Sequence, residues 1–313
     1  MIRTVFMGSS AFACPCLDAL LSFPEALVVA VVTQPDRQKG RGLEQMPCEV
    51  KAHIRNREIP ILTPTNVNEA ADVACIRDLA PDLLVIVAYG QILKQPLLAV
   101  PPMGCVNVHA SLLPKYRGAA PIQWAIANGE RETGVTTMLI NQEVDAGGIL
   151  MQRVVPISDD DTGGILEAKL AKAGAELLIE TLSEYGSGRL KPTPQNEGNA
   201  TRAPKLRKTD GRVNWNLPAR EIVNRLRAFT PWPGCTCEVP RSSGRLVRVV
   251  EARVEDGDGQ AAGEVIETSG AGPLVKAGKQ AVRLIQVQPS GGKPMSGAAF
   301  LRGRPLAPGI HLG

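Results

Sequence analysis

Histidine, aromatic residues and long apolar runs are all scarce in this chain, and each shortage narrows the chemistry that it can perform. The 313 residues include three histidines, His53, His109 and His311, and only 4% of the residues are aromatic. A histidine-dependent reaction therefore has few candidates. No uninterrupted apolar run reaches the roughly 18 residues of a membrane-spanning helix, so no membrane partner is expected. The first residues lack the apolar core and cleavage site of a signal peptide, which predicts a cytoplasmic protein.

Metal-binding and dinucleotide-binding motifs are also missing. The seven cysteines are scattered, and the two Cys-x-Cys pairs at 14/16 and 235/237 lack a second pair at zinc spacing. We therefore expect no metal site, and reduced thiols that serve as packing residues. Gly8 stands alone where a dinucleotide fingerprint requires three spaced glycines, so its loop predicts only a tight strand-to-helix turn.

Charge is distributed unevenly along the chain, although the total is only +4. Residues 1–204 contain 18 Lys and Arg against 22 Asp and Glu, whereas residues 205–313 contain 17 against 9. The basic second part favours an anionic partner. Ordinary solubility without a partner is the alternative.

The first half alternates continuous β-branched runs with helical patterns. The runs at 27–33 (LVVAVVT) and 83–88 (LLVIVA) are typical of buried parallel strands, and helical patterns occupy 11–21 and 70–79. This alternation predicts an α/β fold with an open sheet. Ligands bind beyond the carboxyl ends of the strands in such sheets.

The second half predicts a small β-barrel that follows a linker. A segment rich in Gly, Pro and Asn separates it from the first half, and we expect His311 to lie in a mobile tail. Short strands separated by turns are typical of such barrels. The strands are expected at 236–239, 246–252, 263–266, 274–277 and 281–287. The predicted division is residues 1–188 for the first domain, 189–207 for the linker and 208–313 for the second domain.

Asn107 and His109 are the first candidates for chemistry. A strand is predicted at 104–108 and ends at His109, and the spacing of two residues places both side chains on one face of it. The alternative is a capped strand end with a hydrogen-bonded histidine. Asp145 precedes two glycines that permit close approach of the backbone to a ligand. An acid in this setting is usually a turn residue. It becomes a candidate only if its loop packs beside His109.

The polar segment 34–46 is long for a loop between a strand and a helix. It carries Arg37, Lys39 and Arg41. A long polar loop on a compact sheet is often a binding element. A solvated connection is the alternative.

Taken together, six motifs resemble the methionyl-tRNA formyltransferase family over nearly the whole chain. They are TQPDRQKGRG, NVHASLLPKYRGAAPIQWAI, EVDAGGIL, APKLRKTDGRVNW, AFTPWPG and QPSGGKPMSGAAFLRG. The resemblance implies a Rossmann-like formyltransferase domain followed by an OB-like barrel, and transfer of a formyl group from 10-formyltetrahydrofolate to methionine on initiator tRNA. It implies a monomer that needs no metal.

The resemblance also implies roles for individual residues. Asn107, His109 and Asp145 are the implied catalytic residues, and the loop with Arg37, Lys39 and Arg41 is the implied tRNA contact. The implied tetrahydrofolate site consists of Ser111, Leu112, Leu113 and Pro114, together with Tyr89, Gln91, Ile92 and Leu93.

This chain departs from the family pattern where Leu43, Glu44 and Gln45 replace lysines, which weakens the expected phosphate contacts of the loop. Lys115 or Arg117 is a candidate for the glutamate tail of the folate, with a solvated loop as the alternative. Two other functions stay open from the residues. One is formylation of an amino-sugar nucleotide or other small amine, and the other is non-catalytic tRNA binding.

Overall fold

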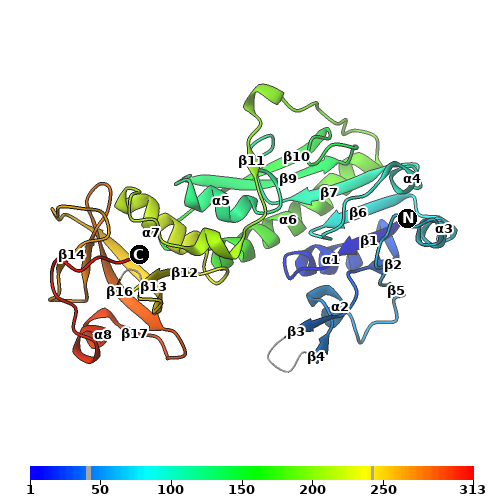
Figure 1. The fold of residues 1–313 in the computed structure, drawn as a ribbon. Coiled ribbons are helices and arrows are strands. Elements are labelled where there is room, and N and C mark those ends of the chain that lie inside the picture. The colour runs from blue at the N-terminus through cyan, green and yellow to red at the C-terminus, as the bar shows by residue number, and fades with distance from the viewer. Residues whose placement is uncertain (40–43, 241–242) are drawn as a thin grey trace. The chain divides into compact units, whose positions relative to one another are not determined.

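The computed structural model describes residues 1–39, 44–240 and 243–313, and they form two compact units. The first unit consists of residues 1–121, 132–156 and 167–203, and the second of residues 122–131, 157–166 and 204–313. The units therefore interleave along the chain, whereas the predicted domains followed one another. Figure 1 labels most of the helices and strands of both units.

A seven-stranded sheet forms the centre of the first unit, in the order β10-β9-β7-β6-β1-β2-β5. Five strands from β7 to β5 are parallel, and β9 and β10 are antiparallel additions at one edge. This arrangement confirms the predicted Rossmann-like open sheet. The strands are β1 (Ile2–Gly8), β2 (Ala26–Val32), β5 (Ile61–Leu62), β6 (Leu83–Val87), β7 (Cys105–His109), β9 (Glu132–Leu139) and β10 (Ile149–Pro156).

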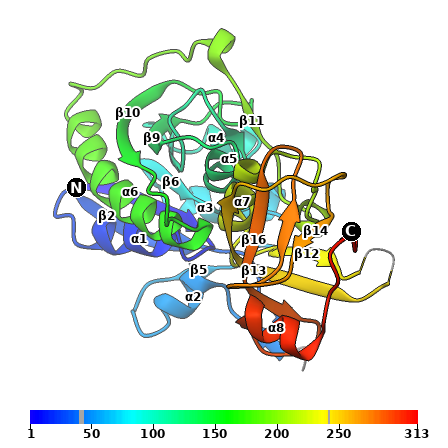
Figure 2. The same cartoon turned by 90° about the vertical axis from the view of Figure 1, so that its left-hand side faces the viewer.

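Helices cover both faces of this sheet (Figure 2). On one face, Gly174 of α6 faces Val108 and Val135 of the sheet and Cys16 of α1. On the other face, α3 and α4 contribute Ile76 and Leu97 to a buried apolar cluster. The helices of these layers are α1 (Ala13–Leu21), α3 (Ala70–Asp78), α4 (Gln95–Leu98) and α6 (Gly163–Gly186). No helix within the described ranges is long and apolar enough to cross a membrane.

The first unit contains further short elements, several of which the sequence did not predict. The segment 34–46 contains the antiparallel strands β3 and β4. His53 lies at the end of a short helix and pairs with Asp18, at 2.8 Å. These elements are β3 (Arg37–Lys39), β4 (Glu44–Met46), α2 (Glu49–His53), β8 (Arg117–Gly118), β11 (Arg202–Ala203) and the 3-10 helix η1 (Glu197–Asn199).

The second unit is built on an antiparallel sheet in the order β12-β13-β16-β15-β14, with β17 paired to β16. Its strands follow the predicted positions closely. They are β12 (Cys235–Glu238), β13 (Leu246–Glu255), β14 (Val265–Glu267), β15 (Leu274–Lys276), β16 (Ala281–Pro289) and β17 (Met295–Ser296). Its helices are α5 (Pro121–Ala127), which begins at the end of the first unit, η2 (Lys208–Gly211), α7 (Ala219–Ala228) and α8 (Gly297–Gly303).

The C-terminal tail belongs to this sheet, so the expectation of a mobile His311 is wrong. His311 forms an antiparallel bridge with Glu264, and the amide of Leu312 donates to the Gly263 carbonyl at 2.8 Å. Gly313 then exchanges two backbone hydrogen bonds with Glu238 of β12. The tail thus satisfies backbone groups at the edges of both β14 and β12, which would otherwise be unpaired.

The predicted linker is also more structured than its composition indicated. Thr193 forms a bridge with Ile149 at the start of β10, and β11 pairs in parallel with β8. Residues 193–203 are therefore part of the first unit. Their backbone groups find partners far away in sequence, and a rule that reads composition locally misses such pairing.

Candidate active site

The carboxyl ends of β1, β6 and β7 meet at one edge of the sheet, because these strands are parallel neighbours. Gly8 and His109 therefore lie at that edge, as the sequence predicted, and Tyr89 lies there too. Within β7, Asn107 is paired with Met138 of β9, and His109 with Thr136. The spacing of two residues places both polar side chains on the same face of the strand.

The ring of His109 is held by the loop that follows its own strand. The side chain is 7% exposed, and Nε2 lies 3.0 Å from the carbonyl oxygen of Tyr116. A carbonyl only accepts hydrogen bonds, so Nε2 carries a proton and donates it. The remaining nitrogen, Nδ1, lies 3.6 Å from Oδ2 of Asp145. This geometry leaves Nδ1 as the nitrogen that faces the Asp145 carboxylate.

Asp145 comes from the loop between β9 and β10, and the structure places it beside His109. Its Oδ2 accepts a 2.8 Å hydrogen bond from the backbone amide of Gly118. Its backbone has a φ of +54°, a left-handed conformation that few residues other than glycine adopt. The condition that made Asp145 a candidate is met, so the reading as a turn residue alone is insufficient.

The amide of Asn107 is available to a ligand. The residue is half-buried, and among the described residues its side chain has no hydrogen-bond partner. A half-buried amide with two free donor hydrogens is suited to binding an oxygen that gains negative charge.

The loop from Ser111 to Pro114, which is predicted to contact folate, is held in place by hydrogen bonds to Lys115 and Thr136. Ser111 is fully buried and its hydroxyl donates to the carbonyl of Lys115 at 2.6 Å. The amide of Leu113 donates to Oγ1 of Thr136 at 3.1 Å. Leu112 and Pro114 are only half-buried. The loop therefore has a defined shape, and contact between its residues and folate stays a prediction.

The second predicted folate segment, from Tyr89 to Leu93, is also anchored. The Tyr89 carbonyl accepts hydrogen bonds from the Ser9 hydroxyl and from the side-chain amide of Gln34, and the Tyr89 ring is buried. The Gln91 side chain accepts the amide of Val67 at 2.8 Å. Leu93 is buried, whereas Ile92 is 70% exposed. Ile92 is thus the apolar residue of this segment most open to an apolar ligand.

The interpretation of Arg117 as part of a solvated loop is wrong. Its side chain is 4% exposed and forms two hydrogen bonds with the Glu197 carboxylate, at 2.6 and 2.9 Å. The hydrogen bond with Glu197 raises the pKa of Arg117 and lowers the pKa of Glu197. The guanidinium of Arg117 is therefore already paired within the first unit, and its contact with a folate tail stays a prediction. Lys115 is exposed, and its proposed contact with that tail stays a prediction.

Sequence reasoning also missed Gln195, Glu197 and Thr201, which surround this arginine. Gln195 accepts two hydrogen bonds from Arg117, and the Thr201 hydroxyl accepts the amide of Tyr116. No local signal identified them, because they lie about 80 residues from their partners in a stretch that resembles a linker.

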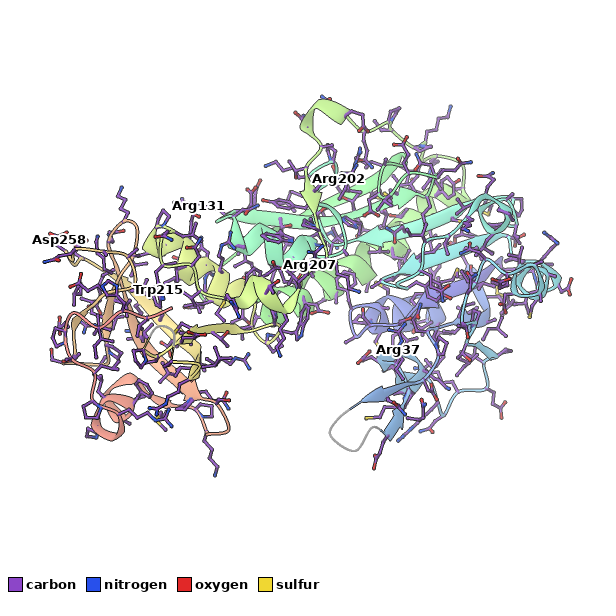
Figure 3. All side chains as sticks on the ribbon, viewed as in Figure 1. Arg37, Arg131, Arg202, Arg207, Trp215 and Asp258 are labelled. Atoms are coloured by element: carbon purple, nitrogen blue, oxygen red, sulfur yellow. The ribbon has the colours of Figure 1, made fainter. Side chains whose placement is uncertain are left out.

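The basic loop is described only in part. Arg37 lies on β3 (Figure 3), and its guanidinium donates to the Gln34 side chain at 2.9 Å. Lys39 ends that strand, and Arg41 lies outside the described residues. The three predicted tRNA contacts therefore stay predictions.

The buried cysteines have the character of packing residues. Cys105 is 2% exposed, and burial raises the pKa of its thiol to about 12. Burial likewise raises the pKa of Cys16 to about 12. Such thiols are neutral near pH 7 and are poor nucleophiles or metal ligands. Within the described ranges, no group of three or more metal-ligating side chains occurs.

Gly147 controls how closely the Asp145 loop approaches β9. A β-carbon at this position would lie 1.7 Å from the Leu139 carbonyl oxygen. We predict that Gly147→Ala lowers the free energy of unfolding by about 1–3 kcal/mol and lowers activity, because overpacking displaces the loop. Thermal unfolding measures the first effect. Gly303→Ala is the control and leaves stability nearly unchanged, because the added carbon meets no described atom within 4 Å apart from its chain neighbours and its own helix backbone. Equal stability of the two variants would contradict the prediction.

Comparison with known proteins assigns the family. The formyl transferase family matches residues 2–182, and the formyl transferase C-terminal domain matches residues 205–305. A methionyl-tRNA formyltransferase from Pelobacter propionicus is 48% identical over 99% of this chain and 95% of its own length. The protein of the same name from Myxococcus xanthus is 44% identical over 98% and 96%. The chain belongs to the methionyl-tRNA formyltransferase family.

Solved structures share the fold of this family at lower identity. An N-formyltransferase from Helicobacter canadensis, in complex with folinic acid and dTDP-3-aminofucose, is 18% identical with a TM-score of 0.64, over 91% of this chain and 99% of its own. HypX from Aquifex aeolicus, in complex with tetrahydrofolic acid, is 20% identical with a TM-score of 0.59, over 96% and 47%.

Proposed function

We propose that the chain transfers the formyl group of 10-formyltetrahydrofolate to the α-amino group of methionine on initiator tRNA, giving N-formylmethionyl-tRNA. The observation that carries the proposal is the meeting of Asn107, His109 and Asp145 at the carboxyl edge of the sheet, with 3.6 Å between His109 Nδ1 and Asp145 Oδ2. These three residues are the proposed catalytic residues. Family membership supports the reaction class.

Asn107 acts on the oxygen of the formyl group. The attack of an amine on the formyl carbon places negative charge on that oxygen. The Asn107 amide donates a hydrogen bond there and is already in place, since the rigid strand β7 holds its backbone. One such preorganised donor typically lowers a barrier by about 3 kcal/mol.

His109 and Asp145 receive the proton that the amine loses. A free α-amine titrates near pH ~8, so a substantial neutral fraction attacks at physiological pH. Since His109 Nε2 donates to Tyr116, the proton is accepted at Nδ1 or at the Asp145 carboxylate that faces it. The negative charge of Asp145 also stabilises His109 when its ring is protonated.

The donor and acceptor occupy different parts of the proposed site. Folate binds against the loop of Ser111, Leu112, Leu113 and Pro114 and the segment of Tyr89, Gln91, Ile92 and Leu93. The acceptor end of the tRNA meets Arg37, Lys39 and Arg41. Residues 205–313, which all lie in the second unit and contain 17 basic against 9 acidic residues, attract the tRNA body. We further propose a cytoplasmic monomer.

The test is formyl transfer from 10-formyltetrahydrofolate to three acceptors in parallel: initiator Met-tRNA, elongator Met-tRNA and a dTDP-linked amino sugar. We predict transfer to initiator Met-tRNA at least roughly 100-fold faster than to either other acceptor, a ratio within the range that enzymes reach by differential binding. Preference for the sugar would keep the reaction class and overturn the tRNA assignment. Binding of tRNA with no transfer to any acceptor would overturn the catalytic role.

A further inference from the structure

The side chain of Gln195 forms hydrogen bonds with the backbone of the Asp145 loop. Its Nε2 donates to the carbonyl oxygens of Asp145 and Gly147, both at 2.8 Å. These two carbonyls flank the short turn that directs the Asp145 carboxylate toward His109. Asp145 has a left-handed backbone, a conformation that costs free energy in non-glycine residues and is maintained by surrounding contacts.

Arg117 sets the orientation of the Gln195 amide. Oε1 of Gln195 accepts bonds from Nε and Nη2 of Arg117, at 3.0 and 2.8 Å. A guanidinium has only donors, so the amide oxygen must face it and the amide nitrogen must face the loop. Glu197 holds the other edge of the buried guanidinium. The orientation of Gln195 is therefore determined on both sides.

The same stretch of chain also supports His109. The Thr201 hydroxyl accepts the amide of Tyr116, and the Thr201 carbonyl accepts the amide of Arg117. Tyr116 in turn provides the carbonyl that binds Nε2 of His109. Residues 195–201 thus contact the supports of both members of the His109–Asp145 pair.

We infer that Gln195 is a positioning residue of the formyl-transfer site: it fixes the distance between the Asp145 carboxylate and His109, with Arg117 and Glu197 fixing Gln195. This inference rests on the proposed function. If Gln195 served stability alone, its substitution would lower the free energy of unfolding without a specific effect on the step that uses Asp145. The two roles therefore separate by experiment.

The first variant is Gln195→Glu. It retains an oxygen for Arg117 but replaces the amide donor with an oxygen that repels the Asp145 and Gly147 carbonyls. We expect kcat to fall roughly 10- to 100-fold, as for a small misplacement of a reacting group, while KM for 10-formyltetrahydrofolate changes less than about twofold. Gln142→Glu is the matched control, since its exposed side chain bonds to Gln95. Its kcat is expected to equal that of the wild type.

Gln195→Met is a second variant, with similar length and no hydrogen bonds, in case the glutamate disturbs folding. It is expected to lower kcat in the same direction. Wild-type kcat in a folded Gln195→Met protein would overturn the inference.

A double-mutant cycle with Asp145→Asn supplies the decisive readout. Asp145→Asn removes the carboxylate, so the position of that group no longer matters. Gln195→Glu is then expected to cause no further loss in the rate constant of formyl transfer, measured in single-turnover experiments. The same fold loss in both backgrounds would overturn the positioning role. Absence of formyl transfer by the wild-type chain would overturn the proposed function instead, so the two failures are distinguishable.

Discussion

Replacing Asp145 with asparagine is expected to lower kcat for formyl transfer by roughly 10³-fold, within the range that acid–base catalysis contributes. The substitution removes the charge that faces Nδ1 of His109 and the oxygen that can receive a proton. The remaining side-chain oxygen can still accept the amide of Gly118. The measurement is single-turnover formylation of initiator Met-tRNA at saturating 10-formyltetrahydrofolate.

Asparagine is a better replacement than alanine at this position because of the backbone. At a φ of +54°, alanine is disfavoured by about 1 kcal/mol or more, whereas asparagine is one of the residues that tolerates this region. A loss of activity in Asp145→Ala would therefore combine chemistry with loop distortion.

Asp82→Asn is the matched control for Asp145→Asn. Asp82 also accepts a backbone amide, that of Arg3 at 2.8 Å, but lies outside the site residues described above. The control is expected to retain wild-type kcat. Near-normal turnover by Asp145→Asn would refute the proton-accepting role of the carboxylate.

The sheet was predictable because its strands carry their own signal. A parallel strand covered on both faces must be apolar at nearly every position, and β6 is buried along its whole length. The edge strands β5 and β10 were missed, since both residues of β5 are only half-buried and Leu150 is the one buried residue of β10. The extent of burial therefore distinguishes a strand such as β6, which the sequence predicted, from the two edge strands that it did not predict.

The candidate site was only half predictable, for a related reason. Asn107 and His109 share one strand, so the spacing of two residues was enough to place them together. The position of Asp145 depends on a loop whose supports, Gln195 and Arg117, come from distant parts of the chain. The composition of the stretch around Gln195 is typical of a linker. Its hydrogen bonds to remote partners leave no periodic pattern in the sequence, so the sequence did not reveal its structure.

Replacing Asn107 with aspartate is expected to lower kcat by roughly 10²- to 10³-fold, the range seen when one oxyanion donor is lost. The variant has the same shape, and the backbone of β7 keeps its pairing with both neighbouring strands. The amide donor becomes an oxygen that repels the developing negative charge. The loss is expected mainly in kcat, because the charge on the formyl oxygen exists only in the transition state and the intermediate.

Asn141→Asp separates this effect from a general effect of added charge near the site. Asn141 is exposed, and its side-chain oxygen accepts the amide of Glu143, a bond that aspartate retains. Its kcat is expected to stay within about twofold of the wild type, as for most surface substitutions. A rise in KM with unchanged kcat in Asn107→Asp would assign the amide to substrate binding instead. An unchanged kcat together with an unchanged KM would mean that a donor other than Asn107 stabilises the oxygen.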